Sequence, residues 1–300
     1  MRYIAVADIH FREDRPICRS EEDNTEWLAT FERKMVDVAT IAEANKVAGI
    51  LFAGDLVHSW RNNSDWFKVW MIRQLNRWGA VCPIFSIPGN HDSMGGKLEE
   101  LDRTPYRILS EAGVIWDILT RPMDDIAGYP YTKTDRLDSK AEIVLAHKLL
   151  WHTEEPYPGA PMTGNIKHFV KNCLNPQCRL LVSGDNHKPF TTKVGDVTVV
   201  NCGSLTRQEA SQADYEPAVW LIDITGDAVE VTPCFIPTDS VILRDHIDNK
   251  QERLEMLDGA VAEIDGNFEV TLNFKDNYKN LIKDHTNAKE LAIKFEECNK

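Results

Sequence analysis

The sequence predicts an α/β fold in which two packed, mixed β-sheets are flanked by helices, followed by a small C-terminal α/β annex. The first half of the chain alternates short apolar strands with helical patterns, which is typical of a parallel sheet. The part after residue 143 is richer in strands, which indicates a second sheet packed on the first. The pattern changes again near residue 237, so we expect a catalytic domain at 1–236 and the annex at 237–300.

Strands and helices alternate through the first half. Short apolar runs mark the strands, and apolar residues at helical spacing mark the helices. Asn24 or Thr25 is the candidate cap of the first helix, Ser64 caps the second, and Thr104-Pro105 begins a third. The elements expected here are strands at 3–7, 49–53, 81–87 and 114–118, and helices at 27–42, 65–78 and 104–112.

Two further regions follow. Gly195-Asp196, between two β-rich runs, signals a hairpin in the second sheet. The strands expected in that sheet are 143–146, 179–183, 190–194, 197–201 and 218–224. After Pro237 a helix, an alternating strand and another helix follow without a cluster of candidate ligands, so we expect a capping or interaction region.

Composition restricts the class of protein. With 43% hydrophobic and 27% charged residues, the 300-residue chain should fold around a substantial core. The 34 basic and 47 acidic residues give a net charge of −13, which argues against broad electrostatic binding to nucleic acid. It does not exclude a nuclease, because bound cations would neutralise several carboxylates. The N-terminal apolar run is too short for a signal peptide and no stretch approaches a membrane span, so we expect a cytoplasmic protein without membrane contact.

Several cysteines, tryptophans and histidines have simpler structural interpretations. The seven cysteines are scattered and odd in number, which favours reduced thiols, and the close pair Cys173 and Cys178 is expected to be structural. Trp60, beside Arg61, is open between packing and stacking on DNA bases. Three tryptophans at helical spacing are predicted core residues: Trp66, Trp70 and Trp78. Four histidines without a motif are expected to be structural or solvent-facing: His152, His168, His246 and His285.

Five predicted strands end in side chains of the kinds that bind metal ions. A Gly-Asp turn or a single histidine after a strand is more often structural when it stands alone. Five such strand ends in succession favour a shared site, since open α/β sheets build their sites at the carboxyl ends of strands. The residues concerned are Asp8, His10, Asp55, Asn90, His91, His147, Asp185 and His187.

The residue types indicate a site for two hard cations. Asp8 and His10, two residues apart on a strand, would point to the same side and chelate one ion. Asp55 could bridge two ions, and Asn90 offers a neutral oxygen suited to manganese. Two ions about 3.5–4 Å apart lower the pKa of a bridging water and hold phosphate oxygens for in-line attack. The pattern therefore predicts phosphoester hydrolysis by a metal-bridging hydroxide, without a covalent enzyme intermediate.

The ordered motifs Asp-x-His, Gly-Asp, Gly-Asn-His-Asp, His and Gly-x-x-His resemble the calcineurin-like metallophosphoesterase family over residues 8–187. Within that family, Gly54-Asp-Leu-Val-His58 is similar to the Gly-Asp-Leu-Phe-His of SbcD-type DNA-repair nucleases. The segment Asn201-Cys-Gly-Ser-Leu-Thr-Arg207 is similar to their Gly-Ser-x-x-Arg segment. The resemblance implies the metallophosphoesterase sandwich as the fold.

Residue by residue, the resemblance also implies roles. Metal one would be bound by Asp8, His10, Asp55 and His187, and metal two by Asp55, Asn90, His147 and Asp185. His91 matches the catalytic histidine of the family, which protonates the leaving oxygen or stabilises charge on the phosphoryl group. His58 would contact the scissile phosphate, or else be a surface histidine on a mobile loop.

Asp185 departs from the family, which commonly has histidine there. A carboxylate is a harder ligand and tilts selectivity toward manganese or magnesium. Asp8, Asp55 and Asp185 then total −3 against +4 for two divalent ions, so a weaker Lewis acid is expected at metal two. That expectation would not hold if Asp185 faced away from the metal. The non-enzyme alternative is a scaffold that kept the fold and lost activity, and Asp185 is the one residue that favours it.

The leading function is a manganese-dependent phosphodiesterase that acts on DNA as an exonuclease, with endonuclease activity left open. The resemblance implies an SbcC-like SMC-type ATPase partner and a homodimer formed through helices near the active domain. The alternative is a phosphoesterase for a small nucleotide or cyclic nucleotide, which the acidic charge would suit. A Ser/Thr protein phosphatase is disfavoured, because the chain has Gly-Asn-His-Asp where that group shows Gly-Asn-His-Glu.

Overall fold

The structure is a computed structural model that describes residues 1–61, 63–153, 160–214, 216–237 and 242–243. Nearly all of the predicted annex at 237–300, including His246 and His285, lies outside the described residues. The annex and the boundary at residue 236 therefore stay predictions. In the part of the chain that is described, we find no helix long and apolar enough to cross a lipid bilayer.

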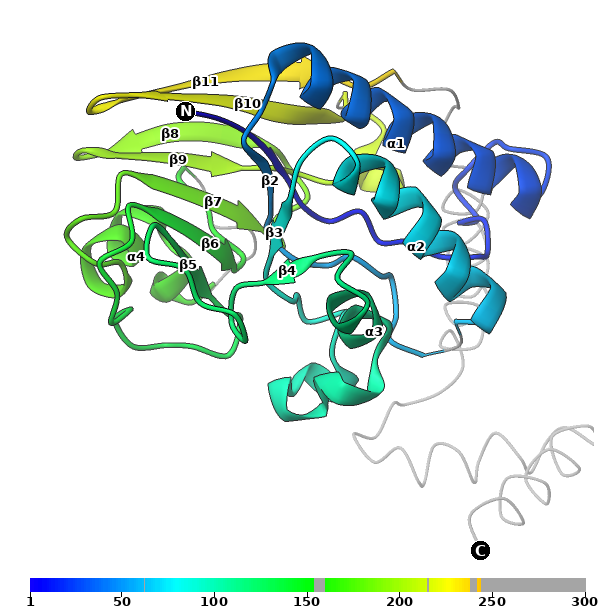
Figure 1. Ribbon diagram of the computed structural model, residues 1–300, viewed down its shortest axis with the longest axis horizontal. Coiled ribbons are helices and arrows are strands. Elements are labelled where there is room, and N and C mark those ends of the chain that lie inside the picture. Colours follow the sequence, from blue (N-terminus) through cyan, green and yellow to red (C-terminus); the bar gives the residue numbers. More distant parts are fainter. Residues whose placement is uncertain (62, 154–159, 215, 238–241, 244–300) are drawn as a thin grey trace, which may run out of the picture. The chain divides into compact units, whose positions relative to one another are not determined.

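Two mixed β-sheets form the framework (Figure 1). The first sheet has the order β11-β10-β1-β2-β3-β4 and the second has the order β5-β6-β7-β9-β8. The strands of the first sheet are β1 (Arg2–Val6), β2 (Gly49–Phe52), β3 (Ile84–Ser86), β4 (Trp116–Asp117), β10 (Ala218–Thr225) and β11 (Ala228–Phe235). Those of the second are β5 (Ile126–Tyr129), β6 (Ile143–His147), β7 (Leu180–Gly184), β8 (Phe190–Val194) and β9 (Val197–Asn201). The predicted fold class is confirmed.

Four α-helices and four short 3₁₀ turns accompany the sheets within the described residues. The α-helices are α1 (Asn24–Asn45), α2 (Asp65–Gly79), α3 (Pro105–Glu111) and α4 (Ile166–Cys173), and the 3₁₀ turns are η1 (Met94–Gly96), η2 (Leu98–Arg103), η3 (Met162–Gly164) and η4 (Ala210–Gln212). Ser64 caps α2 as predicted, accepting from the N–H of Phe67 at 3.1 Å. The cap of α1 is Asp23, one residue before the predicted candidates, because its carboxylate reaches the N–H of Glu26.

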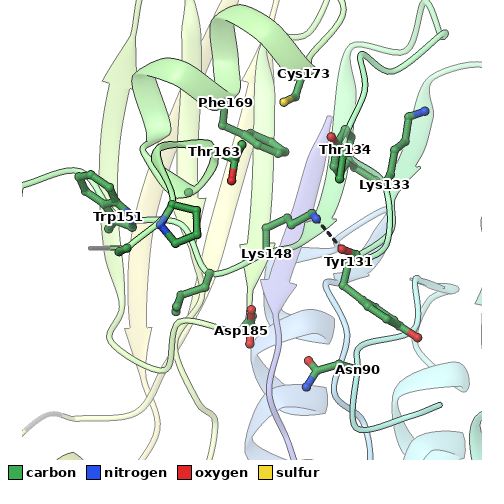
Figure 2. Close-up of a pocket in the computed structure, with 15 residues that line it drawn as sticks. Asn90, Tyr131, Lys133, Thr134, Lys148, Trp151, Thr163, Phe169, Cys173 and Asp185 are labelled. Carbon is green, nitrogen blue, oxygen red and sulfur yellow. Dashed lines mark hydrogen bonds between the residues drawn. The ribbon is translucent and has the colours of Figure 1, made fainter. Parts of the chain in front are cut away.

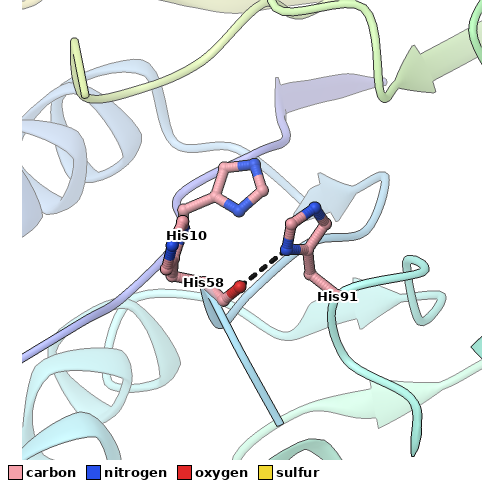
Figure 3. A group of neighbouring side chains, drawn as sticks. All are labelled: His10, His58 and His91. Atoms are coloured by element: carbon pink, nitrogen blue, oxygen red, sulfur yellow. Dashed lines mark hydrogen bonds between the residues drawn. The ribbon is translucent and has the colours of Figure 1, made fainter. Parts of the chain in front are cut away.

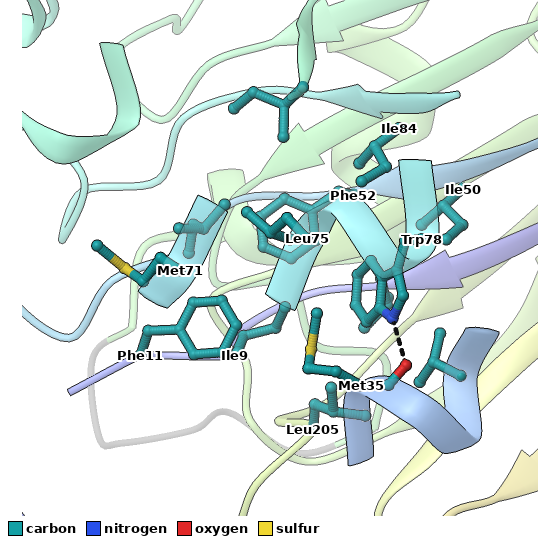
Figure 4. Packing of buried hydrophobic residues seen from close by; sticks show 14 of the residues in the cluster. Ile9, Phe11, Met35, Ile50, Phe52, Met71, Leu75, Trp78, Ile84 and Leu205 are labelled. Carbon is teal, nitrogen blue, oxygen red and sulfur yellow. Dashed lines mark hydrogen bonds between the residues drawn. The ribbon is translucent and has the colours of Figure 1, made fainter. Parts of the chain in front are cut away.

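The packing follows from the two-residue period of the strands. In β1, Ile4 and Val6 face a core shared with α1 and α2, whereas Tyr3 and Ala5 face the second sheet. Figure 4 shows the helix-side core, in which the indole N–H of Trp78 donates to the carbonyl of Met35 at 2.8 Å. A third core lies between the second sheet and α4. The layers are therefore helices, sheet, sheet and helix.

One strand was expected in the wrong sheet, and three elements were not predicted. Strand β10 belongs to the first sheet, not the second, because it pairs antiparallel with β1 in the register Ile4↔Leu221. Apolar alternation predicts a strand but not its neighbour. Strands β5 and β11 and helix α4 were not predicted. None of the eight residues of β11 is fully buried, which agrees with its position at the edge of the first sheet.

Trp66 is not a core residue. Its exposed fraction is 57%, whereas Trp70 and Trp78 are buried as predicted. The buried face of α2 begins at Phe67, so the residue one place earlier lies at the edge of that face. Trp60 is half-buried, and the guanidinium carbon of Arg61 lies 4.4 Å from its ring centroid. The six cysteines in the described residues are free thiols, as expected, and Cys298 lies outside them.

Candidate metal centre

The predicted site residues come together at the carboxyl ends of five strands from both sheets. Asp8 and His10 follow β1, and Asp55 and His58 follow β2. The remaining strands contribute as follows: Asn90 and His91 follow β3, His147 ends β6, and Asp185 and His187 follow β7. Close contacts join all nine side chains in one cluster. His152 is exposed and His168 half-buried, and neither belongs to the cluster.

The backbone is strained at four of these positions. Asp8, His10, Asp55 and Asp185 have φ values of 51°, 50°, 57° and 77°, in the left-handed region that side chains with a Cβ rarely adopt. Lys46 is the other non-glycine residue of this kind in the described residues. The strand geometry predicted for Asp8 and His10 is therefore wrong, because β1 ends at Val6. The two side chains meet through a strained loop held by hydrogen bonds to the carbonyls of Gly54 and Asp55.

Asp55 lies at the middle of the cluster. Its Oδ2 is 3.6 Å from Nε2 of His10, and its Oδ1 is 3.4 Å from Nε2 of His147. Its two oxygens thus face different histidines, as a bridging ligand between two cations requires. Gly89 makes room for it, because a Cβ there would lie 2.0 Å from Oδ1 of Asp55. Burial opposes ionisation, but His147, His10 and His91 outweigh it and hold the pKa of Asp55 below its usual value.

His10 and His187 form one half of the cluster. Their Nε2 atoms are 3.1 Å apart, and burial lowers the pKa of both rings, so both are neutral near pH 7. Nδ1 of His10 is buried without a hydrogen-bond partner among the described residues. Asp8 completes this half, and burial raises its pKa. An unpartnered buried nitrogen beside facing imidazoles and a carboxylate fits a cation site.

His147 forms the other half. Its Nδ1 lies 2.8 Å from the carbonyl of Ala53, and because a carbonyl only accepts, Nδ1 must donate. Its Nε2 therefore points into the cluster, 2.9 Å from Oδ1 of Asn90 and 4.0 Å from Oδ1 of Asp185. Asp185 thus faces this half. Burial acts to lower the pKa of His147, but Asp55, Asp8 and Asp185 outweigh it and raise the pKa to about 10.

The rings of His91 and His58 make edge contacts with the ring of His10, with centroid distances of 4.9 Å and 5.9 Å (Figure 3). Nδ1 of His91 donates to the carbonyl of His58 at 2.6 Å, which leaves its Nε2 free of that bond. Nε2 of His58 lies 3.3 Å from the guanidinium of Arg12, which can only donate, so this nitrogen accepts. Burial and then Arg12 lower the pKa of His58. The half-buried His58 lies within the cluster rather than apart from it.

The sequence analysis did not predict the supporting role of Asp92. The fully buried carboxylate of Asp92 accepts from the N–H groups of Leu56, Val57 and Gly89 and so ties two ligand-bearing loops together. Burial, with Asp55 second, raises the pKa of Asp92 to about 7. Its position as the last residue of Gly-Asn-His-Asp is the signal that could have found it.

The segment at 201–207 supports the loop after β1. Ser204 donates to the carbonyl of Asp8 at 3.0 Å, and Thr206 donates to that of Ile9 at 3.1 Å. Gln212 adds a contact outside this segment: its amide nitrogen lies 3.1 Å from Nδ1 of His187, and its oxygen accepts from the backbone N–H of Glu209. The contact with Gln212 orients the ring of His187, and the bond from Glu209 holds the amide in place. No sequence motif indicated this role for Gln212.

The sequence was compared with protein families, with curated proteins and with solved structures. The family profile described as calcineurin-like phosphoesterase matches residues 1–203. The chain belongs to the calcineurin-like phosphoesterase family. Members of this metallophosphoesterase family use divalent metals, and the Asp and His cluster is a fitting place for them.

Individual relatives of this calcineurin-like phosphoesterase are more distant. The DNA double-strand break repair protein Mre11 of Haloferax volcanii is 27% identical over 250 residues, which cover 77% of this chain and 51% of that protein. Mre11 of Methanosarcina mazei is 24% identical, over 88% of this chain and 43% of that protein. The chain thus spans about half the length of the curated relatives it matches. The solved phosphoesterase Yfce of E. coli is 18% identical, with a TM-score of 0.39, over 81% of this chain and 100% of that one.

Proposed function

We propose that this calcineurin-like phosphoesterase is a two-metal phosphodiesterase that cleaves DNA as an exonuclease, with endonuclease activity left open. The observation that carries the two-metal proposal is Asp55, whose two carboxylate oxygens face His10 on one side and His147 on the other. The similarity to Mre11 proteins over most of the chain supports DNA as the substrate. The Gly54–His58 and 201–207 motifs support the same choice.

The proposed ligands fall into two sets that share Asp55. Metal one is held by Asp8, His10, Asp55 and His187, and metal two by Asp55, Asn90, His147 and Asp185. Four of these seven ligand residues offer carboxylate or amide oxygens, which favours manganese, with magnesium as the alternative. The three carboxylates give −3 against +4 for two divalent ions, so the loaded centre keeps a positive charge that attracts a phosphate.

The chain's own groups then have separate tasks. Bound divalent ions supply a deprotonated water and positive charge for the phosphate oxygens. His91 lies beside the centre with its Nδ1–H donating to the carbonyl of His58, so Nε2 is the nitrogen left for the leaving oxygen. When the ring is protonated at both nitrogens, Nε2 donates a proton to that oxygen. His58, oriented by Arg12, contacts the scissile phosphate.

The proposal extends to partners. We propose an SbcC-like SMC-type ATPase that delivers DNA ends, a homodimer, and a cytoplasmic location where that DNA is found. Co-purification with a candidate ATPase and the mass of the isolated protein in solution test the first two.

Degradation of an end-labelled linear duplex tests the function. Metal-stripped protein is given manganese, with His91→Ala as the control, and we expect shortening that the variant abolishes. Intact DNA combined with hydrolysis of a cyclic nucleotide would favour the small-substrate alternative, which the net charge of −13 suits. Absence of manganese binding in calorimetry would favour a scaffold.

A further inference from the structure

Each half of the candidate metal centre borders a cavity. One cavity, of about 340 Å³, is lined by Asn90 and Asp185 of the proposed metal-two set (Figure 2). The other, of about 620 Å³, is lined by His187 of the metal-one set and by Gln212 of η4. Gln212 is buried, with 3% of its surface exposed, and its amide contacts the ring of His187. The side chain of Gln212 therefore acts directly on a proposed ligand of metal one.

Two backbone donors fix the direction in which the amide of Gln212 points. Its oxygen accepts from the backbone N–H groups of both Gln208 and Glu209. Turning the amide over would place its nitrogen, which can only donate, against these two donors, and both bonds would be lost. The oxygen therefore faces the backbone and the nitrogen faces His187, 3.1 Å from Nδ1.

The amide nitrogen decides which ring nitrogen of His187 carries hydrogen. Because this nitrogen donates, Nδ1 of His187 accepts and carries no hydrogen. The hydrogen of the ring then lies on Nε2, which is 3.1 Å from Nε2 of His10. His10 must accept at that nitrogen, so its own hydrogen lies on Nδ1, the buried atom without a partner among the described residues. One contact from Gln212 thus sets the hydrogen positions of both rings.

This tautomer of His187 does not suit a metal ligand. A metal ion needs a lone pair on the ring nitrogen that faces it, and ligating histidines almost always donate their other N–H to an acceptor. His147 has that arrangement, because its Nδ1 donates to the carbonyl of Ala53. His187 has the reverse arrangement, with a donor at Nδ1 and hydrogen on the nitrogen that faces His10. To ligate through Nε2, the ring must move its hydrogen to Nδ1 and lose the bond from Gln212.

We propose that Gln212 is a positioning residue that holds His187 in the tautomer that cannot ligate, and so lowers the affinity of the metal-one site. The inference rests on the metal-one ligand set of the proposed function and adds the residue that tunes it. The hydrogen only changes its place on one ring, so this step releases no proton. A glutamate at 212 would accept from the two backbone N–H groups and from Nδ1–H of His187, so Gln212→Glu should favour the ligating tautomer.

Long-range proton–nitrogen NMR of the histidine rings tests the tautomer in metal-stripped protein at mildly alkaline pH. A ring nitrogen that carries hydrogen is distinguished by its chemical shift from one with a lone pair, and the signals absent from His187→Asn belong to His187. In wild type we expect the lone pair on Nδ1 and the hydrogen on Nε2. In Gln212→Glu we expect hydrogen on Nδ1. Hydrogen on Nδ1 of His187 in the wild type would overturn the proposal.

Manganese calorimetry tests the effect on affinity. We expect Gln212→Glu to tighten the binding event that His187→Asn abolishes by roughly tenfold or more, the size of effect that groups supporting a metal ligand have. Ser211→Glu is the matched control, because it adds the same charge at an exposed residue whose side chain bonds to Glu209 rather than His187. The control should leave both events nearly unchanged.

The outcomes separate this inference from the proposed function. Equal tightening in Gln212→Glu and Ser211→Glu would reveal an effect of charge alone and overturn the role of Gln212. The expected tautomers, combined with no manganese binding in wild type or either variant, would instead overturn the proposed two-metal function.

Discussion

The two halves of the candidate metal centre hold their histidines in opposite states. In the half with His10 and His187, burial lowers the pKa of both rings, so they are neutral and offer lone pairs. In the other half, the carboxylates of Asp55, Asp8 and Asp185 overcome burial and raise the pKa of His147 to about 10. That ring is protonated in the metal-free protein at neutral pH.

The difference between the halves shows that the balance between burial and nearby carboxylates decides whether each imidazole is protonated. Where carboxylates surround an imidazole closely, a proton serves as the cation that balances them. Where His10 and His187 face each other at 3.1 Å, burial outweighs the nearby carboxylates and lowers the pKa of each ring, so both rings stay neutral. His10 and His187 therefore carry no extra proton for a metal ion to displace at neutral pH, whereas His147 must release one.

Asp55→Asn should have the largest effect, because this carboxylate touches both halves. We expect the variant to lose both manganese-binding events in calorimetry and all DNA cleavage. The amide keeps the shape of the side chain, so loss of the fold is not the expected cause, and circular dichroism checks this. One surviving binding event of unchanged affinity would show that Asp55 serves a single half.

His91→Ala should leave both halves intact and still slow the reaction. Its ring lies over the cluster and is held by the carbonyl of His58, so removing it takes away a proton donor and no proposed ligand. General acid catalysis contributes about 10²–10⁴-fold, and we expect kcat to fall by that factor with manganese affinity unchanged. An unchanged rate would remove His91 from the mechanism.

Metal binding in the second half should release the proton of His147. Because the pKa of His147 is raised to about 10, a metal ion must displace its proton at neutral pH, and affinity should rise roughly tenfold per pH unit up to pH 10. Calorimetry in two buffers of different ionisation enthalpy counts the protons released. Two binding events that both lack proton release would contradict the raised pKa of His147.

The raised pKa of His147 also affects the stability of the metal-free protein. It stabilises the fold below an unfolded pKa of about 6.5, and that contribution is lost as pH rises through 10.

Asp185→Asn should have the smallest effect, confined to the second half. The substitution removes one negative charge 4.0 Å from Nε2 of His147 and keeps the shape of the side chain. We expect manganese affinity there to fall by at least roughly tenfold, since changing even the groups that support a metal ligand costs about 10–100-fold. Affinity of the first half should stay the same. Equal weakening of both events would mean that Asp185 acts on the whole cluster.

Much of the site could be predicted from local patterns. Asp55 and His147 follow short apolar strands, and the carboxyl ends of such strands converge in an α/β sheet. The backbone behind this convergence could not be predicted, since Asp8 and His10 meet through left-handed conformations rather than strand geometry. Asp92 and Gln212 were missed because each acts through hydrogen bonds to residues brought near it by folding.

By itself, the sequence determined most of the strands and helices, the presence of two sheets and the chemical types of the candidate ligands. These follow from local periodicity and from residues at strand ends, which a linear chain displays directly. Only the tertiary structure decided that β10 joins β1, that Trp66 is exposed, and that a cavity lies beside Asn90 and Asp185. Strand partners, burial and protonation depend on distances between segments far apart in the chain, and those distances exist only after folding.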